Sequence, residues 1–136
     1  MKKVIRDLWI LTEDGTAIFT RIFDQELEVQ LFAMLMSALN SFAMEISTTG
    51  ISNFELNNIR FDILKKRNLL FIATSSPKFK KKFILNELEI ISKQFFELYG
   101  VDISNNWDGE ISKFTDFTEV INKSVEKRVQ SFLDNI

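Results

Sequence analysis

Lysines, carboxylates and hydroxyls are the side chains of this chain that could do chemistry, because it contains no Cys and no His. Disulfides, thiolate nucleophiles and Ser-His-Asp triads are therefore excluded. The isolated glycines form no phosphate-binding fingerprint. Residues 102–108 alternate oxygen side chains as a calcium loop does, but Trp107 replaces the required Gly and no Glu occupies the twelfth position. We expect no enzymatic activity, no cofactor and no metal.

The most prominent charged feature is a run of basic residues without an acid, from Lys65 to Lys82. Its two groups, residues 65–67 and 78–82, flank an apolar segment that as a strand would hold them roughly 23–26 Å apart. The second group is a candidate contact for a phosphate or an acidic partner, because free backbone N–H groups at a helix start favour anions. The alternative is a solvated surface. The candidate residues are Ser76, Lys78, Lys80, Lys81 and Lys82.

Size and composition indicate one soluble domain spanning residues 1–136. Apolar residues make up 46 % of the chain and charged residues 26 %, which is ordinary for a globular protein. The net charge of −2 disfavours nucleic acid as a partner. The start of the chain carries no signal-peptide core, and no apolar run is long enough to span a membrane. We expect a cytoplasmic protein.

Residues 69–76 organise the predicted fold. Five apolar residues in a row, from Leu69 to Ala73, indicate a strand that is buried on both faces. A hairpin is predicted over residues 4–23, with its turn at Asp14-Gly15. Residues 51–58 and 59–65 alternate apolar and polar side chains, so we expect each of these strands to have one covered and one more open face.

Three helices complete the predicted order. The first begins with Asp24 as N-cap, runs to about Ile46, and carries an apolar arc of roughly 220°, wider than one sheet contact requires. The second opens at Ser76-Pro77 and closes at Gly100. A loop over residues 101–113 leads to the last helix, whose start is marked by Asp116. Two doubly buried strands require helices on both faces of a mainly antiparallel sheet, an α+β fold in three layers.

This order resembles that of longin domains of the longin and roadblock superfamily, in particular the small stand-alone proteins of archaea. The resemblance covers nearly the whole chain and rests on three segments. They are Leu8-Trp9-Ile10, Leu39-Asn40-Ser41-Phe42-Ala43, and Asn106-Trp107-Asp108-Gly109-Glu110 followed by Phe114 and Phe117. The resemblance implies a ββαβββαα topology with sheet order 2-1-5-4-3, one helix on one face and two on the other.

The resemblance also implies a non-enzymatic adaptor that binds a small GTPase or its regulator in membrane traffic, and that pairs with itself or with another longin or roadblock protein. The strand over residues 51–58 would lie at a sheet edge, where unpaired backbone groups invite another chain. We therefore expect an interface formed by this edge and the open side of the first helix, made of Phe32, Met36, Leu39, Phe54 and Leu56. The alternative is a peripheral membrane module that holds anionic lipid through the basic start of the second helix.

Overall fold

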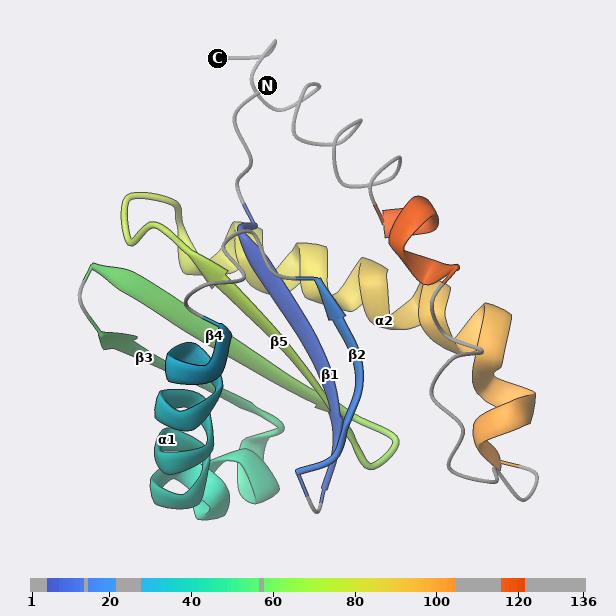
Figure 1. Ribbon diagram of the computed structural model, residues 1–136, viewed down its shortest axis with the longest axis horizontal. Coiled ribbons are helices and arrows are strands. Elements are labelled where there is room, and N and C mark those ends of the chain that lie inside the picture. The colour runs from blue at the N-terminus through green and yellow to red at the C-terminus, as the bar shows by residue number, and fades with distance from the viewer. Residues whose placement is uncertain (1–4, 14, 22–27, 57, 105–115, 122–136) are drawn as a thin grey trace, which may run out of the picture.

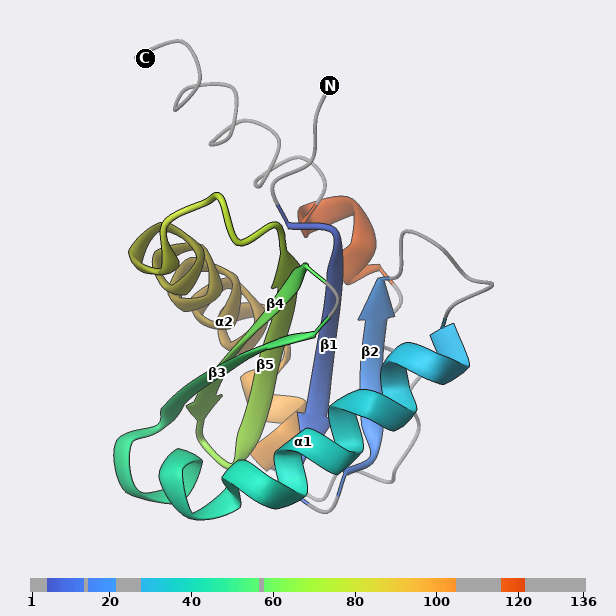
Figure 2. The same cartoon turned by 90° about the vertical axis from the view of Figure 1, so that its left-hand side faces the viewer.

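The computed structural model describes residues 5–13, 15–21, 28–56, 58–104 and 116–121. Five strands form one antiparallel sheet in the order β2-β1-β5-β4-β3. They are β1 (Asp7–Thr12), β2 (Ala17–Arg21), β3 (Ile51–Leu56), β4 (Ile59–Lys66) and β5 (Leu69–Ser75). Helix α1 (Glu28–Thr49) lies across one face, and α2 (Lys81–Ser104) lies on the other with the helical segment 117–121 (Figures 1 and 2). The predicted three-layer α+β fold and its strand order are confirmed.

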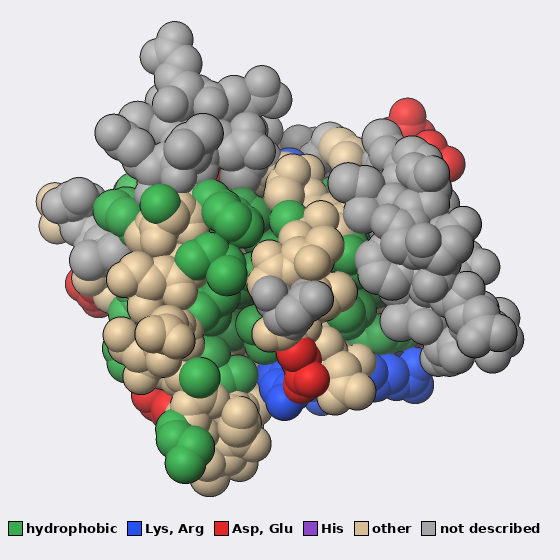
Figure 3. Space-filling model, turned by 60° about the horizontal axis from the view of Figure 1, so that its bottom comes forward, with side chains coloured by type: hydrophobic (Ala, Val, Ile, Leu, Met, Phe, Trp, Pro, Cys, Tyr) green, Lys and Arg blue, Asp and Glu red, His purple; other side chains and the backbone are tan. Residues whose placement is uncertain are grey.

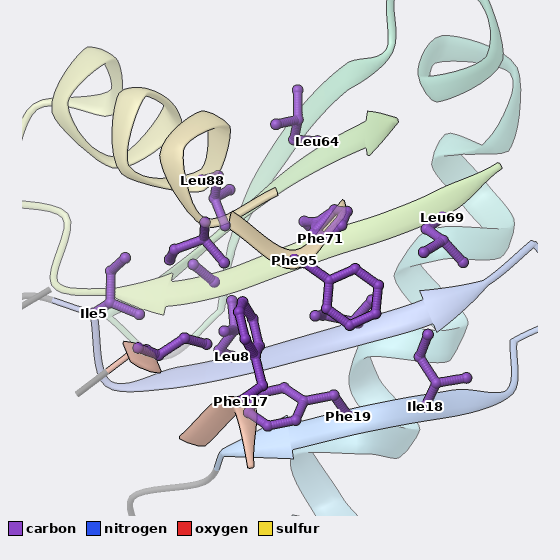
Figure 4. Packing of buried hydrophobic residues seen from close by; sticks show 14 of the residues in the cluster. Ile5, Leu8, Ile18, Phe19, Leu64, Leu69, Phe71, Leu88, Phe95 and Phe117 are labelled. Carbon is purple, nitrogen blue, oxygen red and sulfur yellow. The ribbon is translucent and has the colours of Figure 1, made fainter. Parts of the chain in front are cut away.

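The two central strands divide the core between the two faces of the sheet. Leu8 and Ile10 of β1 point toward α2, whereas Trp9 and Leu11 point toward α1, and all four are fully buried. On the α2 side, Phe95 and Phe117 meet Phe19 in a cluster of edge-on rings (Figure 4). Buried apolar residues on both faces explain why the sequences of β1 and β5 do not alternate.

Strand β4 differs from its prediction. Its alternating sequence predicted one open face, but residues 60 to 64 are all buried. Arg60 and Asp62 point toward α2, where they form an ion pair with Nε 2.9 Å from Oδ2. The alternating sequence of β4 thus places apolar side chains under α1 and the ion pair under α2. The face under α2 can be buried despite its charges, because the two charges are paired.

The turns agree with the sequence. Gly15 has a φ of 91°, and Gly50, after the end of α1, has a φ of 76°. Asn58 follows β3 with a φ of 63°, and Arg67 and Asn68 join β4 to β5 with φ values of 50° and 66°. Asn tolerates this left-handed region better than most residues, which explains the placement of two of these three side chains.

Both boundaries of α2 differ from the prediction. Residues 76–80 form a separate turn, in which the Phe79 N–H donates to the Ser76 carbonyl over 3.1 Å, and the helix begins at Lys81. It then passes Gly100 and ends at Ser104. Gly100 is buried, and a Cβ there would lie 3.6 Å from the Arg67 guanidinium. Gly100 therefore lies within the helix rather than ending it, and the neighbouring Arg67 lies over the Phe96 ring at 4.8 Å.

Some sequence-based expectations concern parts of the chain outside the described residues. The proposed N-cap Asp24, the loop over residues 105–113 and most of the last helix belong to this group. Of that helix, residues 117–121 are helical as predicted, with Phe117 and Ile121 buried against the core.

Candidate interaction site

Strand β3 forms one edge of the sheet and leaves a row of backbone groups open. It pairs with β4 from Ile51 opposite Leu64 to Leu56 opposite Ile59. In the described sheet, the other side of β3 has no neighbouring strand. The predicted edge is confirmed, and such an edge can pair with another chain.

A groove runs between β3 and α1 with a volume of about 700 Å³. It is mostly apolar, and Glu55 is the one charged residue among the described residues that line it. Its lining consists of Ala33, Met34, Ser37, Ala38, Ser41, Phe42, Phe54 and Glu55. Depletion of charge and enrichment in Met and Phe are typical of the core of a protein interface.

A stack of aromatic rings connects this groove to the core. The rings of Phe42 and Phe54 are parallel within 10° at a centroid distance of 5.8 Å. Phe54 stacks in turn on the buried Phe61 at 4.6 Å, and Phe61 lies 6.2 Å from Trp9. The half-buried Phe54 thus packs on a fully buried ring, and Phe42 stacks on Phe54. Side chains that are already packed in this way lose less conformational entropy when a partner covers them.

The structure separates the residues predicted for this interface. Phe54 lies in the groove, and the side chain of Leu56 is outside the described set. Phe32 packs against the core on the α1 side. Met36 and Leu39 line a different hollow of about 400 Å³, between α1 and the β1–β2 turn, where a Cβ on Gly15 would lie 2.6 Å from Met36 Cε.

The helix residues that face β3 were missed by the sequence-based interpretation. They are Met34, Ala38 and Phe42, which belong to the same apolar arc as Met36 and Leu39 but lie on its other flank. Figure 3 shows how broadly hydrophobic side chains spread over the α1 side of the molecule. Because the arc is wide, periodicity alone could not assign its flanks to β3 or to the β1–β2 turn.

The second predicted site is assembled at the start of α2. Ser76 and Lys78 lie in the preceding turn, where the Ser76 hydroxyl accepts from the Lys78 N–H over 3.4 Å. Lys80 follows, and Lys81 and Lys82 begin the helix. All four lysines are exposed. The other basic group, residues 65–67, lies at the opposite end of β5, as predicted.

The buried ion pair offers no catalytic group to a substrate. Burial raises the pKa of Asp62, whereas the hydrogen bond and charge of Arg60 and the charge of Lys81 oppose that shift and Glu55 adds to it. Asp62 has no exposed surface, so a molecule in solution cannot reach its carboxylate. Within the described part of the chain, no three acidic residues are grouped as a metal site would require.

Comparison with known proteins identifies the family of this fold. The family described as "First Longin domain of FUZ, MON1 and HPS1" matches residues 6–111. The chain belongs to this longin family. Longin and roadblock domains are protein-interaction modules, generally without enzymatic activity.

Solved structures agree with this assignment at the level of the fold. A Roadblock/LC7 domain from Streptomyces avermitilis superposes with a TM-score of 0.55 at 13 % identity, over 70 % of this chain and 85 % of that chain. No curated protein matches this longin domain. None of its described helices is long and apolar enough to cross a bilayer.

Proposed function

We propose that this longin domain is a dimerising adaptor that holds a small GTPase or its regulator in membrane traffic. The observation that carries the proposal is the open edge of β3 beside the groove that holds Phe42 and Phe54. The longin family and the roadblock-like fold support an adaptor, and the GTPase part rests on the family resemblance. The partner at the groove is a second copy or another longin or roadblock protein.

Edge pairing explains the composition of the groove. A second β3 strand would satisfy the open backbone groups, and its side chains would cover the stacked rings of Phe42 and Phe54. The groove keeps one acidic residue, Glu55, at the edge itself. One charge on an otherwise uncharged edge strand is a weak barrier to pairing.

Sedimentation equilibrium of the full chain over a concentration series tests the interface. Phe54→Lys should convert a dimer to a monomer, because a charge would enter the apolar groove without a partner. Ser41→Arg should do the same without affecting the fold, since Ser41 is exposed on the groove. Thr20→Lys, on the opposite sheet edge, is the matched control and should remain dimeric.

A wild-type monomer at all concentrations, or dimers that persist in both groove variants, would refute self-association through this edge. Capture of a GTPase by the immobilised domain in the GTP-loaded but not the GDP-loaded state tests the second part of the proposal. Equal capture in both nucleotide states, or none, would refute nucleotide-dependent binding of the GTPase, and only its regulator would then remain as the proposed partner.

A further inference from the structure

The start of α2 forms a surface in which lysines alternate with apolar side chains. Four exposed lysines surround Phe79, Phe83 and Leu85, which are half-buried and pack inward against the core on the α2 side. Lys78 Nζ lies 5.4 Å from the centre of the Phe79 ring. We call this the basic–aromatic surface, and it comprises Lys78, Phe79, Lys80, Lys81, Lys82, Phe83 and Leu85.

The surface is also concave and open. A wide hollow of about 890 Å³ lies over it, lined by Lys80, Lys81, Lys82, Phe83, Leu85, Asn86 and Glu89. Half-buried apolar side chains thus form the floor between flexible cationic ones.

Most of the described acidic residues near this surface are buried or paired, and the exception is the exposed Glu55 of β3, whose charge acts on Asp62 as that of Lys81 does. Glu89 forms an ion pair with Lys66 over 3.2 Å. Asp62 is buried with Arg60, and Glu87 is only 2 % exposed. Four exposed lysines thus outnumber the exposed carboxylates of Glu55 and Glu89, and the net charge of the described residues at this surface is positive. The first turn of α2 contains no acid, although the helix dipole favours acids and disfavours lysines there. Helix stability thus does not account for these lysines.

We propose that the basic–aromatic surface docks this protein onto an anionic lipid bilayer. Clusters of four or more lysines are attracted to the negative surface of such a membrane, and each lysine adds about 1 kcal/mol, which is roughly fivefold in the partition coefficient at 1.4 kcal/mol per tenfold. The apolar side chains between them can enter the interfacial region of the bilayer.

The types of residue favour a bilayer over a structured acidic ligand. Lysine is a flexible point charge, suited to diffuse lipid charge, whereas a defined phosphate or carboxylate is more often held by the fixed fork of an arginine. No arginine lines the hollow among its described residues.

The position of the surface leaves the proposed protein interface accessible. It lies on the α2 side of the sheet, whereas the groove between α1 and β3 lies on the opposite face (Figure 2). The bilayer proposal therefore does not depend on dimerisation, and either proposal can fail alone.

Flotation of the full chain with vesicles measures the partition coefficient. Wild-type protein should float with phosphatidylcholine vesicles that contain about 30 % phosphatidylserine, and not with phosphatidylcholine alone. Lys80→Gln with Lys82→Gln should lower the coefficient about 25-fold, at about fivefold per lysine. Lys65→Gln with Lys93→Gln removes the same charge elsewhere and should change it less than threefold. Equal binding to both vesicle types, or equal losses in both double variants, would overturn the proposal.

A labelled cysteine tests the orientation, because the chain has no other cysteine. Asn86→Cys places a polarity-sensitive dye in the hollow over the basic–aromatic surface, and Asn40→Cys places it on the exposed side of α1. Addition of the phosphatidylserine vesicles should shift the emission of the first dye to the blue and leave the second unchanged. The reverse pattern, or identical shifts, would overturn the docking orientation.

Discussion

At the scale of single residues, the most unusual feature is the carboxylate of Asp62 under α2. Its burial disfavours the charged form, and the neighbouring Arg60 only partly restores it, so its pKa is raised above the ordinary value of 3.8. The folded protein therefore holds this proton more tightly than the unfolded chain does. Most paired carboxylates have the opposite effect.

A pH series of denaturant unfolding tests this shift. Between pH 3.8 and the raised pKa of folded Asp62, the folded state binds more protons at this carboxyl group than the unfolded state does. The contribution of Asp62 to the unfolding free energy is therefore greatest below pH 3.8. It is lost as the pH rises through the folded pKa. The unfolding free energy of wild type minus that of Asp62→Asn should therefore fall over this window and level off above it. A difference that grows with pH would show that Arg60 lowers the pKa instead.

At the scale of elements, α2 shows how one residue can be misread from its type alone. Gly100 resembles a helix stop, but the chain remains helical on both sides of it. Glycine inside a helix costs about 0.5–1 kcal/mol relative to Ala. Its neighbours would accept a methyl group, since the nearest side-chain atoms lie 3.6–4.0 Å from the position of a Cβ.

We expect Gly100→Ala to stabilise the protein by about 0.5–1 kcal/mol, provided that Arg67 keeps its position over Phe96. Thermal and urea unfolding of the two proteins measure this difference. Gly15→Ala is the matched opposite case, because Gly15 has a φ of 91° and a Cβ would come within 2.6 Å of Met36 Cε. It should destabilise the protein. Destabilisation by Gly100→Ala as well would contradict the prediction and would show that a methyl group is not accepted beside Arg67 and Phe96.

At the scale of the whole molecule, the sheet separates two surfaces of different chemistry. The α1 side presents a groove that is nearly free of charge, and the α2 side presents lysines around apolar side chains. The two proposed interactions occupy opposite faces, so one copy can take part in both. A dimer built through β3 would present two basic–aromatic surfaces, and its avidity for a membrane would exceed that of a monomer if both reach the bilayer together.

We expect a substitution on the α2 face to leave dimerisation unchanged, and a substitution on the α1 face to leave the binding of the lysines to lipid unchanged. Lys80→Gln with Lys82→Gln should leave the sedimentation-equilibrium dissociation constant within about twofold, since distant sites without shared partners are additive. Ser41→Arg should give a monomer that has lost the avidity of the dimer for vesicles but still binds them through its lysines. Its flotation with vesicles should therefore remain sensitive to salt. A lysine variant that dissociates the dimer would show that the two surfaces are coupled through the fold.

The amino-acid sequence by itself determined the order of strands and helices, the two doubly buried strands and the turns. These features depend on local periodicity and on the conformational limits of Gly and Asn, which act over a few neighbouring residues. The resemblance to longin domains then supplied the sheet order. The acid-free basic run was also visible in the sequence, and so was its division by a strand.

Only the tertiary structure decided which flank of the α1 arc meets β3, that Gly100 lies inside a helix, and that Arg60 and Asp62 are buried. The physical reason is the same in each case. A polar side chain on an alternating strand is predicted to be exposed, because the sequence of the strand does not show that a distant helix covers it. The partner of an apolar helix flank likewise depends on the position of the sheet, which local sequence does not specify. Burial and partnership depend on residues distant in sequence, and no local pattern encodes them.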